Sequence, residues 1–240
     1  MTARPRVGLF VTCLVDLVRP RIGFAAVKLL EQAGCDVVVP QAQTCCGQPA
    51  WNAGADKDAR DIAERVIAAF SEFDYVVAPS GSCSGMIRRH YPEVLNNAPR
   101  ALALAAKTHE LTSFLVNVRG MKSVAARCTA RACYHDSCSS LREMRVRDQP
   151  RHLLASVEGL SLGELADREV CCGFGGLFSV KYPEISERMA DDKIADAMAT
   201  GADMLIGGDL GCLLHLEGRM KRQGTKMRVR HVAEVLADET

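Results

Sequence analysis

The sequence predicts an α/β protein built from two pseudo-symmetric repeats, each a small parallel sheet flanked by helices. Two observations predict this fold. The same pattern of four cysteines occurs in both halves of the 240-residue chain. Short apolar runs also alternate with helical patterns, which is typical of parallel sheets covered by helices. Each repeat cysteine follows an apolar run, so we expect the cysteine loops at the carboxyl ends of the strands, where ligand sites gather.

The cysteine repeat consists of one cysteine, then an adjacent pair followed by glycine, then one further cysteine. Its members are Cys13, Cys45, Cys46 and Cys83 in the first half, and Cys138, Cys171, Cys172 and Cys212 in the second. The spacings match closely, and internal repeats of this kind indicate a duplicated unit. We expect a first repeat with its connecting helix at residues 1–120 and a second at residues 121–240.

The strands are predicted from short apolar runs, and the helices from apolar residues that recur every three or four positions. In the first half we expect strands at residues 7–11, 36–39 and 75–78, with helices at 20–33, 52–70 and around 87–90. Residues 99–118 contain no cysteine, and we expect one helix there that connects the two halves. In the second half we expect strands at residues 132–134, 160–165, 204–206 and 227–230, with helices at 149–157, 183–200, 213–223 and near the C-terminus.

Charge and apolar patterning restrict the function classes. The formal net charge of +1 provides no bulk field that would favour nucleic acid. No stretch approaches the ~20 apolar residues that a transmembrane helix needs. The first apolar run, residues 7–11, is too short for a signal peptide. We therefore expect a cytoplasmic protein with no transmembrane segment.

Eleven cysteines in a cytoplasmic chain favour metal or redox chemistry over disulfides. Cys35, Cys128 and Cys133 fall outside the repeat, and we expect them to fill the core as small apolar residues. Four converging thiolates bind a soft cation or an iron–sulfur cluster. Two adjacent cysteines reach different irons of a cluster more easily than two corners of one small tetrahedron. We therefore expect an iron–sulfur cluster in each repeat, with zinc in one repeat as the alternative.

The repeated pattern resembles the cysteine-rich CCG domain family, which includes one of the heterodisulfide reductase subunits, the glycolate oxidase iron–sulfur subunit and the lactate-utilisation proteins. The segments Pro79-Ser80-Gly81-Ser82-Cys83, Tyr134-His135-Asp136-Ser137-Cys138 and Cys171-Cys172-Gly173-Phe174-Gly175-Gly176 most resemble the lactate-utilisation branch. That branch also lacks ferredoxin-type Cys-x2-Cys-x2-Cys runs. The resemblance implies companion lactate-utilisation proteins, one of them a ferredoxin-like iron–sulfur subunit.

The chain departs from the fullest family motif at its last position. That motif ends Cys-x2-Cys, whereas this chain has Met86 in the first half and His215 in the second. The five-cysteine motif implies an unusual noncubane cluster, so four cysteines favour an ordinary [4Fe–4S] cluster. His215 is a candidate nitrogen ligand, hydrogen-bond donor or proton carrier, with a core or surface histidine as the structural alternative.

His135 and Asp136 form a second constellation, beside Cys138. A histidine there is suited to relay protons coupled to electron transfer. The structural alternative is that Asp136 caps a turn and His135 orients the loop. Because the titratable groups lie in the second half, we expect the second centre to face the substrate or redox partner.

These expectations combine into one function and two rivals. The resemblance implies an iron–sulfur electron-transfer subunit of an L-lactate-oxidising complex, an oxidoreductase component that is active only with its partner subunits. The first rival is a heterodisulfide-reductase-like subunit that reduces a disulfide or a quinone at a cluster. The second rival is a non-enzymatic zinc-binding module.

Overall fold

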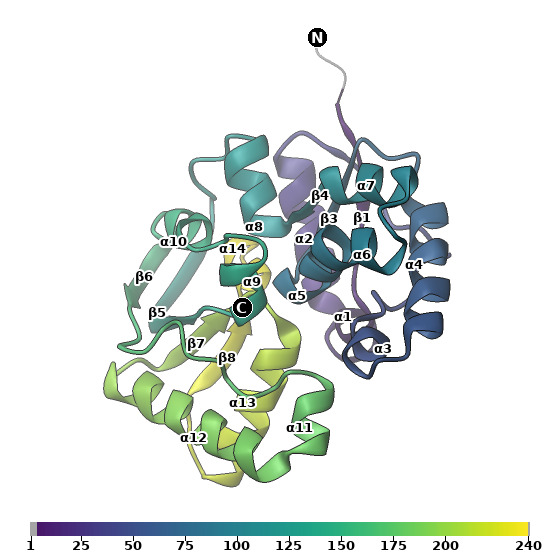
Figure 1. Ribbon diagram of the computed structural model, residues 1–240. Helices are drawn as coiled ribbons and strands as arrows, with labels where there is room; N and C mark the ends of the chain where they lie inside the picture. The colour runs from purple at the N-terminus through teal and green to yellow at the C-terminus, as the bar shows by residue number, and fades with distance from the viewer. Residues whose placement is uncertain (1–3, 240) are drawn as a thin grey trace.

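A computed structural model describes residues 4–239 and contains two four-stranded parallel sheets side by side (Figure 1). The strand orders are β2-β1-β3-β4 and β6-β5-β7-β8, so each strand of one sheet has an equivalent in the other. This confirms the predicted α/β fold with two pseudo-symmetric repeats. The strands are β1 (Arg6–Leu9), β2 (Asp36–Val38), β3 (Tyr75–Ala78), β4 (Thr108–Glu110), β5 (Arg127–His135), β6 (Glu158–Gly163), β7 (Met204–Gly207) and β8 (Arg228–His231).

Helices connect the strands and cover the sheets. In the first repeat they are α1 (Cys13–Val18), α2 (Pro20–Gln32), α3 (Gln48–Asn52), α4 (Asp56–Phe70), α5 (Gly81–Gly85), α6 (Tyr91–Val94), α7 (Pro99–Ala106) and α8 (Leu111–Ser113). Two π-helical turns, η1 (Met86–His90) and η2 (Phe114–Val118), belong to the same part of the chain. In the second repeat they are α9 (Cys138–Arg142), α10 (Asp148–Leu154), α11 (Leu177–Lys181), α12 (Pro183–Ala199), α13 (Leu210–Arg222) and α14 (Val232–Leu236).

The expectation of one helix over residues 99–118 is wrong. The helix stops at Ala106, and β4 follows and pairs in parallel with β3. The backbone N–H of Val76 donates to the carbonyl of Lys107, 2.9 Å away, which starts this pairing. A three-residue edge strand is too short to interrupt the apolar periodicity of its neighbours, so the pattern indicated a continuous helix. β4 is the counterpart of β8, and it completes the repeat.

Each strand of the first sheet sends alternate side chains to opposite faces, as strand geometry requires. Val77 packs on the side of α2, whereas Val76 and Ala78 pack on the side of α4. The core on the α4 side belongs to the first repeat alone. The core on the α2 side continues without a break into the second repeat.

The two repeats therefore share one hydrophobic core. Helix α14, the last element of the chain, packs on α2, which lies near the start of the chain. Figure 1 shows both helices at the boundary between the halves. The ammonium group of Lys28 on α2 donates to the carbonyl of Ala237, 2.6 Å away. On the other side of the boundary His90 faces Glu143 at 3.7 Å. The nearby Glu143 carboxylate raises the pKa of His90.

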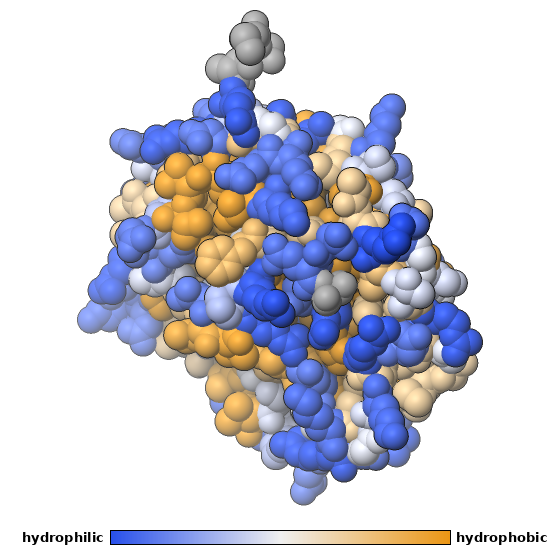
Figure 2. Space-filling model, turned by 180° about the vertical axis from the view of Figure 1, so that it is seen from behind, coloured by the Kyte–Doolittle hydropathy of each residue, from blue (hydrophilic) through white to orange (hydrophobic). Residues whose placement is uncertain are grey.

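The surface carries scattered apolar side chains between charged ones. Figure 2 shows them on one face as separate patches divided by hydrophilic residues, an arrangement common on globular proteins. Among residues 4–239, no helix has the length and apolar character to cross a bilayer.

We expect that residues 1–120 and 121–240, expressed separately, each fail to form a stable fold. Separation would expose the apolar face of α2 and the residues of α14 that cover it, and burial of such surface is the main favourable term in folding. Thermal unfolding followed by circular dichroism would show no cooperative transition for either fragment, while co-expression would restore one. Two fragments that each unfold cooperatively near the temperature of the whole chain would contradict a shared core.

Candidate metal centres

Each set of four cysteines meets at the carboxyl edge of its own sheet. Cys13 follows β1 and starts α1, the Cys45-Cys46 pair lies in the loop after β2, and Cys83 lies in α5 after β3. The second repeat uses the same three positions. Cys138 starts α9 after β5, the pair follows β6, and Cys212 lies in α13 after β7.

The thiols of a set are linked in a chain. In the first set the Sγ atoms of Cys13 and Cys45 lie 3.9 Å apart. The hydrogen bond between them lowers the pKa of Cys45 to about 2 and raises that of Cys13. Cys46 interacts with both Cys45 and Cys83, and its own pKa is raised. Cys45 is therefore a thiolate at neutral pH, the form that binds metals.

The second set reproduces this chain. A hydrogen bond from Cys138 lowers the pKa of Cys171 to about 2. Cys172 interacts with Cys171 and with Cys212. The contact with Cys172 also lowers the pKa of Cys212 to about 7. Two loops with different sequences thus hold four thiols in the same order.

A glycine in the left-handed region forms the turn after each cysteine pair. Gly47 has φ +84° and Gly173 has φ +86°, a conformation that other residues rarely adopt. Each glycine N–H points at the sulfur of the first cysteine of its pair, with an N···S distance of 3.4 Å in both repeats. A Cβ on Gly173 would also lie 2.6 Å from the carbonyl oxygen of Ser186. These turns stabilise the negative charge of Cys45 and of Cys171.

The four sulfurs of a set do not all converge as closely as the ligands of a single zinc ion, although the Sγ atoms of Cys13 and Cys45 lie 3.9 Å apart. In a tetrahedral four-thiolate site, with Zn–S bonds of about 2.3 Å, any two sulfurs lie about 3.8 Å apart. Within residues 4–239, only His135, Cys172 and Cys212 form a group of three whose donor atoms all lie within 4.8 Å of one another. In neither set, therefore, do three cysteines converge as closely as one zinc ion requires.

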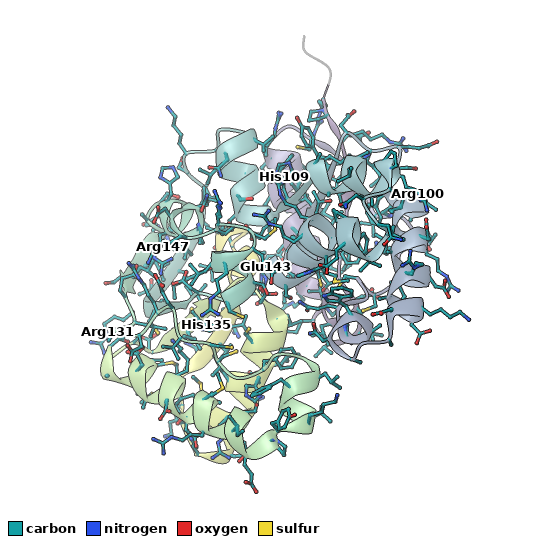
Figure 3. All side chains as sticks on the ribbon, viewed as in Figure 1. Arg100, His109, Arg131, His135, Glu143 and Arg147 are labelled. Atoms are coloured by element: carbon teal, nitrogen blue, oxygen red, sulfur yellow. The ribbon has the colours of Figure 1, made fainter. Side chains whose placement is uncertain are left out.

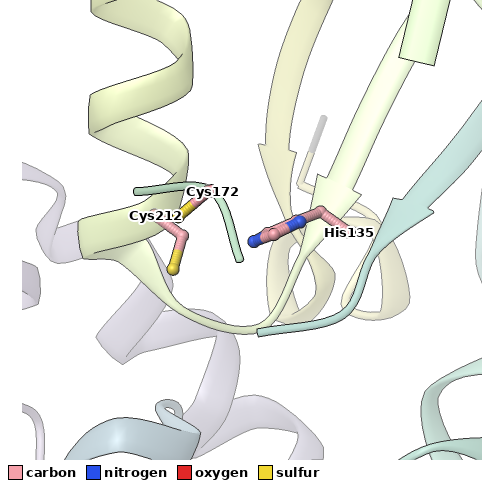
Figure 4. Close-up of side chains that lie close together, drawn as sticks. All are labelled: His135, Cys172 and Cys212. Carbon is pink, nitrogen blue, oxygen red and sulfur yellow. The ribbon is translucent and has the colours of Figure 1, made fainter. Parts of the chain in front are cut away.

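His135 is the histidine that the structure brings to the cysteines. It ends β5, and its ring points toward the sulfurs of Cys172 and Cys212 (Figure 4). Figure 3 places the same ring inside the second repeat. Its side chain is only 1% exposed.

Asp136 and His215, the two other candidates, have partners of their own. Both oxygens of Asp136 accept hydrogen bonds from Arg151, at 2.8 and 2.7 Å, so this carboxylate is held in a bidentate ion pair. His215 Nε2 lies 3.2 Å from the hydroxyl of Ser186, and burial lowers the pKa of the His215 ring. Met86 is fully buried in the α4-side core.

The three cysteines outside the repeat are also buried. Cys35, Cys128 and Cys133 pack in the shared core among aliphatic side chains. Burial raises the pKa of Cys133 to about 11, which keeps it a thiol at neutral pH. These positions suit the filling role expected from the sequence.

Two buried charged residues near the sites were missed by sequence reasoning. Asp209, 3% exposed, receives hydrogen bonds from both repeats. Its donors are the Ser80 hydroxyl (2.6 Å), the Gly81 N–H (3.2 Å), the Ser82 hydroxyl (2.7 Å) and N–H (3.3 Å), the Ser137 hydroxyl (2.5 Å) and the Ser140 hydroxyl (3.4 Å). Asp209 thus joins the loop of Cys83 to the loop of Cys138.

Lys193 is the second missed residue. It is 2% exposed on α12, and its ammonium group donates to the carbonyl of Asp167. Burial lowers the pKa of Lys193, and the Cys172 thiol lies close enough to influence the same pKa. A helical lysine among alternating charged residues is typical of a solvent-exposed face, so the sequence carries no signal that separates Lys193 from the surface lysines.

Two hollows in the surface flank the first centre. One is lined by Cys13 and Cys45 together with Gln43 and Asp16, and the other by Cys45, Pro49 and Arg65. The expectation that the second centre faces the substrate stays a prediction, and these hollows favour access to the first.

The comparisons with known proteins agree with this geometry. The family described as the CCG cysteine-rich domain matches residues 7–88 and again residues 132–217, the stretches that carry all eight cysteines. The chain belongs to the CCG cysteine-rich domain family.

Relatives named Lactate utilization protein A span this CCG protein almost completely. The protein from Geobacillus kaustophilus is 50% identical over 235 residues and covers 96% of this chain and 98% of the relative. The protein from Bacillus subtilis is 47% identical with the same coverage. A crystal structure of a hypothetical protein from Helicobacter pylori matches with a TM-score of 0.69 at 13% identity. It covers 98% of this chain and 48% of that longer chain, and it supports the fold alone.

We expect that Asp209→Ala lowers the free energy of unfolding by about 2–4 kcal/mol, because several buried donors lose their acceptor. Urea unfolding measures the change. Asp203→Ala, which removes an exposed partner of Arg228, is the matched control and should have a much smaller effect. Equal effects of the two substitutions would show that the buried carboxylate does not hold the repeats together.

Proposed function

We propose that this CCG protein is an iron–sulfur electron-transfer subunit of a cytoplasmic complex that oxidises L-lactate. It would act with companion lactate-utilisation proteins, one of them a ferredoxin-like iron–sulfur subunit. The observation that carries the proposal is the pair of equivalent four-cysteine sites in a chain about half identical to proteins named Lactate utilization protein A. The names of these relatives suggest the pathway, and the sites suggest the chemistry.

The donor set fits an iron–sulfur cluster in each repeat. The eight residues that would hold the two clusters are Cys13, Cys45, Cys46 and Cys83, and Cys138, Cys171, Cys172 and Cys212. Thiolates are the usual ligands of such clusters, and N–H groups directed at sulfur tune their potentials. The N–H groups of Gly47 and Gly173 meet the sulfurs in this way. The spread of the sulfurs favours a cluster over a single zinc ion in each set.

When bound, a cluster supplies one-electron transfer, and the chain supplies the environment. The second cysteine of each pair, Cys46 at 3% and Cys172 at 1% exposure, lies on the protein side of its site. Cys13 and Cys138 are only half-buried, so each site is open on one side. Burial on one side and exposure on the other suits a centre that exchanges electrons with a docked partner.

His215 is the group that we propose for proton exchange at the second centre. It is half-buried, and its pKa lies below the ordinary value because of burial, so the ring is neutral at pH 7 and able to accept a proton. The hydroxyl of Ser186 lies beside the ring and donates to the carbonyl of Gly173 in the cysteine loop. The ring is therefore held next to the turn that carries Cys171 and Cys172.

Anaerobically isolated protein should contain about eight iron atoms and about eight sulfides per chain, with little zinc, as two [4Fe–4S] clusters require. Cys46→Ser should remove about half of the iron, and Cys172→Ser the other half. Cys35→Ser, a change in the core away from both sites, is the control and should keep all of it. Stoichiometric zinc without sulfide would contradict the proposal and support the zinc-binding alternative.

His215→Ala should reduce lactate turnover by the assembled complex about 10²-fold or more, the usual contribution of a proton-transfer group, while the iron content stays at the wild-type value. Met86→Leu, at the matching position of the first repeat, is the control and should keep full activity. Loss of activity in Met86→Leu but not in His215→Ala would mean that the first centre carries the chemistry.

A further inference from the structure

The two candidate metal centres differ at the position three residues before their first cysteine. His135 lies three residues before Cys138, and Phe10 lies three residues before Cys13. Both residues lie at the end of the first strand of their repeat and both are buried. Phe10 packs against Phe70, with 5.6 Å between ring centroids. The first centre therefore has an apolar ring where the second has an imidazole.

The imidazole of His135 lacks hydrogen-bond partners in the described structure. Neither Nδ1 nor Nε2 makes a hydrogen bond within residues 4–239, although both atoms are buried. Like Cys172, the ring does lie close enough to the Cys212 thiol to lower the pKa of that thiol. A neutral imidazole carries one N–H donor and one lone pair, and burying them unpaired is unfavourable. The adjacent carboxylate does not help, because both oxygens of Asp136 are bound to Arg151. The sulfurs of Cys172 and Cys212 are the groups beside the ring, so a metal bound by these sulfurs would supply the missing partner.

The sulfurs near the ring show where that partner lies. A ring nitrogen of His135 and the Sγ atoms of Cys172 and Cys212 all lie within 4.8 Å of one another (Figure 4). Metal–nitrogen bonds of about 2.0–2.1 Å and metal–sulfur bonds of about 2.3 Å place two ligands of one metal atom at most roughly 4.6 Å apart. The ring nitrogen therefore lies within reach of a metal atom bound by Cys172 or by Cys212.

We propose that His135 is a nitrogen ligand of the second centre and binds a metal atom that also carries one thiolate, that of Cys172 or of Cys212. The second centre then has four thiolates and one imidazole, and the first has thiolates alone. This inference rests on the proposed function only in taking the second cysteine set as a metal site. It also assigns His135 a role other than the proton relay expected from the sequence.

The test uses the full-length Cys46→Ser protein, prepared anaerobically, so that the signal comes from the second centre. With ¹⁵N-labelled histidine, pulsed electron paramagnetic resonance of the reduced cluster should show the strong ¹⁵N coupling of a directly bound nitrogen. His135→Phe, which copies Phe10 of the first repeat, should lose this coupling and keep iron. His152→Asn removes an exposed histidine and should leave the coupling unchanged.

Several outcomes would overturn the inference. These are the absence of ¹⁵N coupling in a protein with normal iron and sulfide, a weak coupling typical of an N–H···S hydrogen bond, or a strong coupling that survives in His135→Phe. Iron, sulfide and zinc contents of the same sample test the proposed function separately. If the metal is zinc, the proposed function fails, and Co²⁺ put in place of the zinc then reports the nitrogen ligand by the same measurement.

A second variant covers the case in which His135→Phe does not fold. His135→Cys keeps a ligand atom at the same position in a smaller side chain. It should bind metal, unfold cooperatively and lose the ¹⁵N coupling. A His135→Cys protein that retains the coupling would exclude His135 as the ligand.

Discussion

The arrangement of the two centres depends on one buried carboxylate. Asp209 lies at the boundary of the repeats and accepts hydrogen bonds from the loops before Cys83 and around Cys138, while Cys212 follows three residues later in its own helix. A buried carboxylate is tolerable only when its lone pairs are satisfied. The loops must therefore keep their relative positions, and the spacing of the two cysteine sets follows from this requirement.

The surroundings of the two centres differ although their cysteine geometry is the same. The second has His135, Lys193 and Asp209 within its immediate environment, all of them buried. In the first repeat, Cys46 packs in one apolar core with Phe10 and with Val66 and Ile67 of α4. Charged and polar groups in a poorly solvated site change the energy of adding an electron or a proton. Clusters bound as proposed by the two cysteine sets would therefore have unequal potentials.

Local patterns predicted most of the fold and which cysteines the fold brings together at each candidate site. The spacing of the cysteines and the apolar runs before them are local signals, and the two matching sheets follow from them. The strand β4 was missed because three residues are too few to show a strand pattern that differs from the helical pattern around them. Asp209 and Lys193 were missed for a different reason: their burial arises from how distant segments pack on one another, and such long-range pairings leave no trace in a single sequence.

The position of Asp209 bears on how a duplicated protein differs from a homodimer. Its counterpart in the first repeat is Ser80, and the two side chains meet directly at the pseudo-twofold axis. In a symmetric dimer of identical units the axis would bring together either two carboxylates, which repel, or two hydroxyls, which provide no charge for the surrounding donors. A carboxylate on one side and a hydroxyl donor on the other require two different residues. Covalent fusion of the two copies allowed each copy to take a different residue at this position. Because the Ser80–Asp209 hydrogen bond needs both residues, a protein with two copies of the same half would lose it.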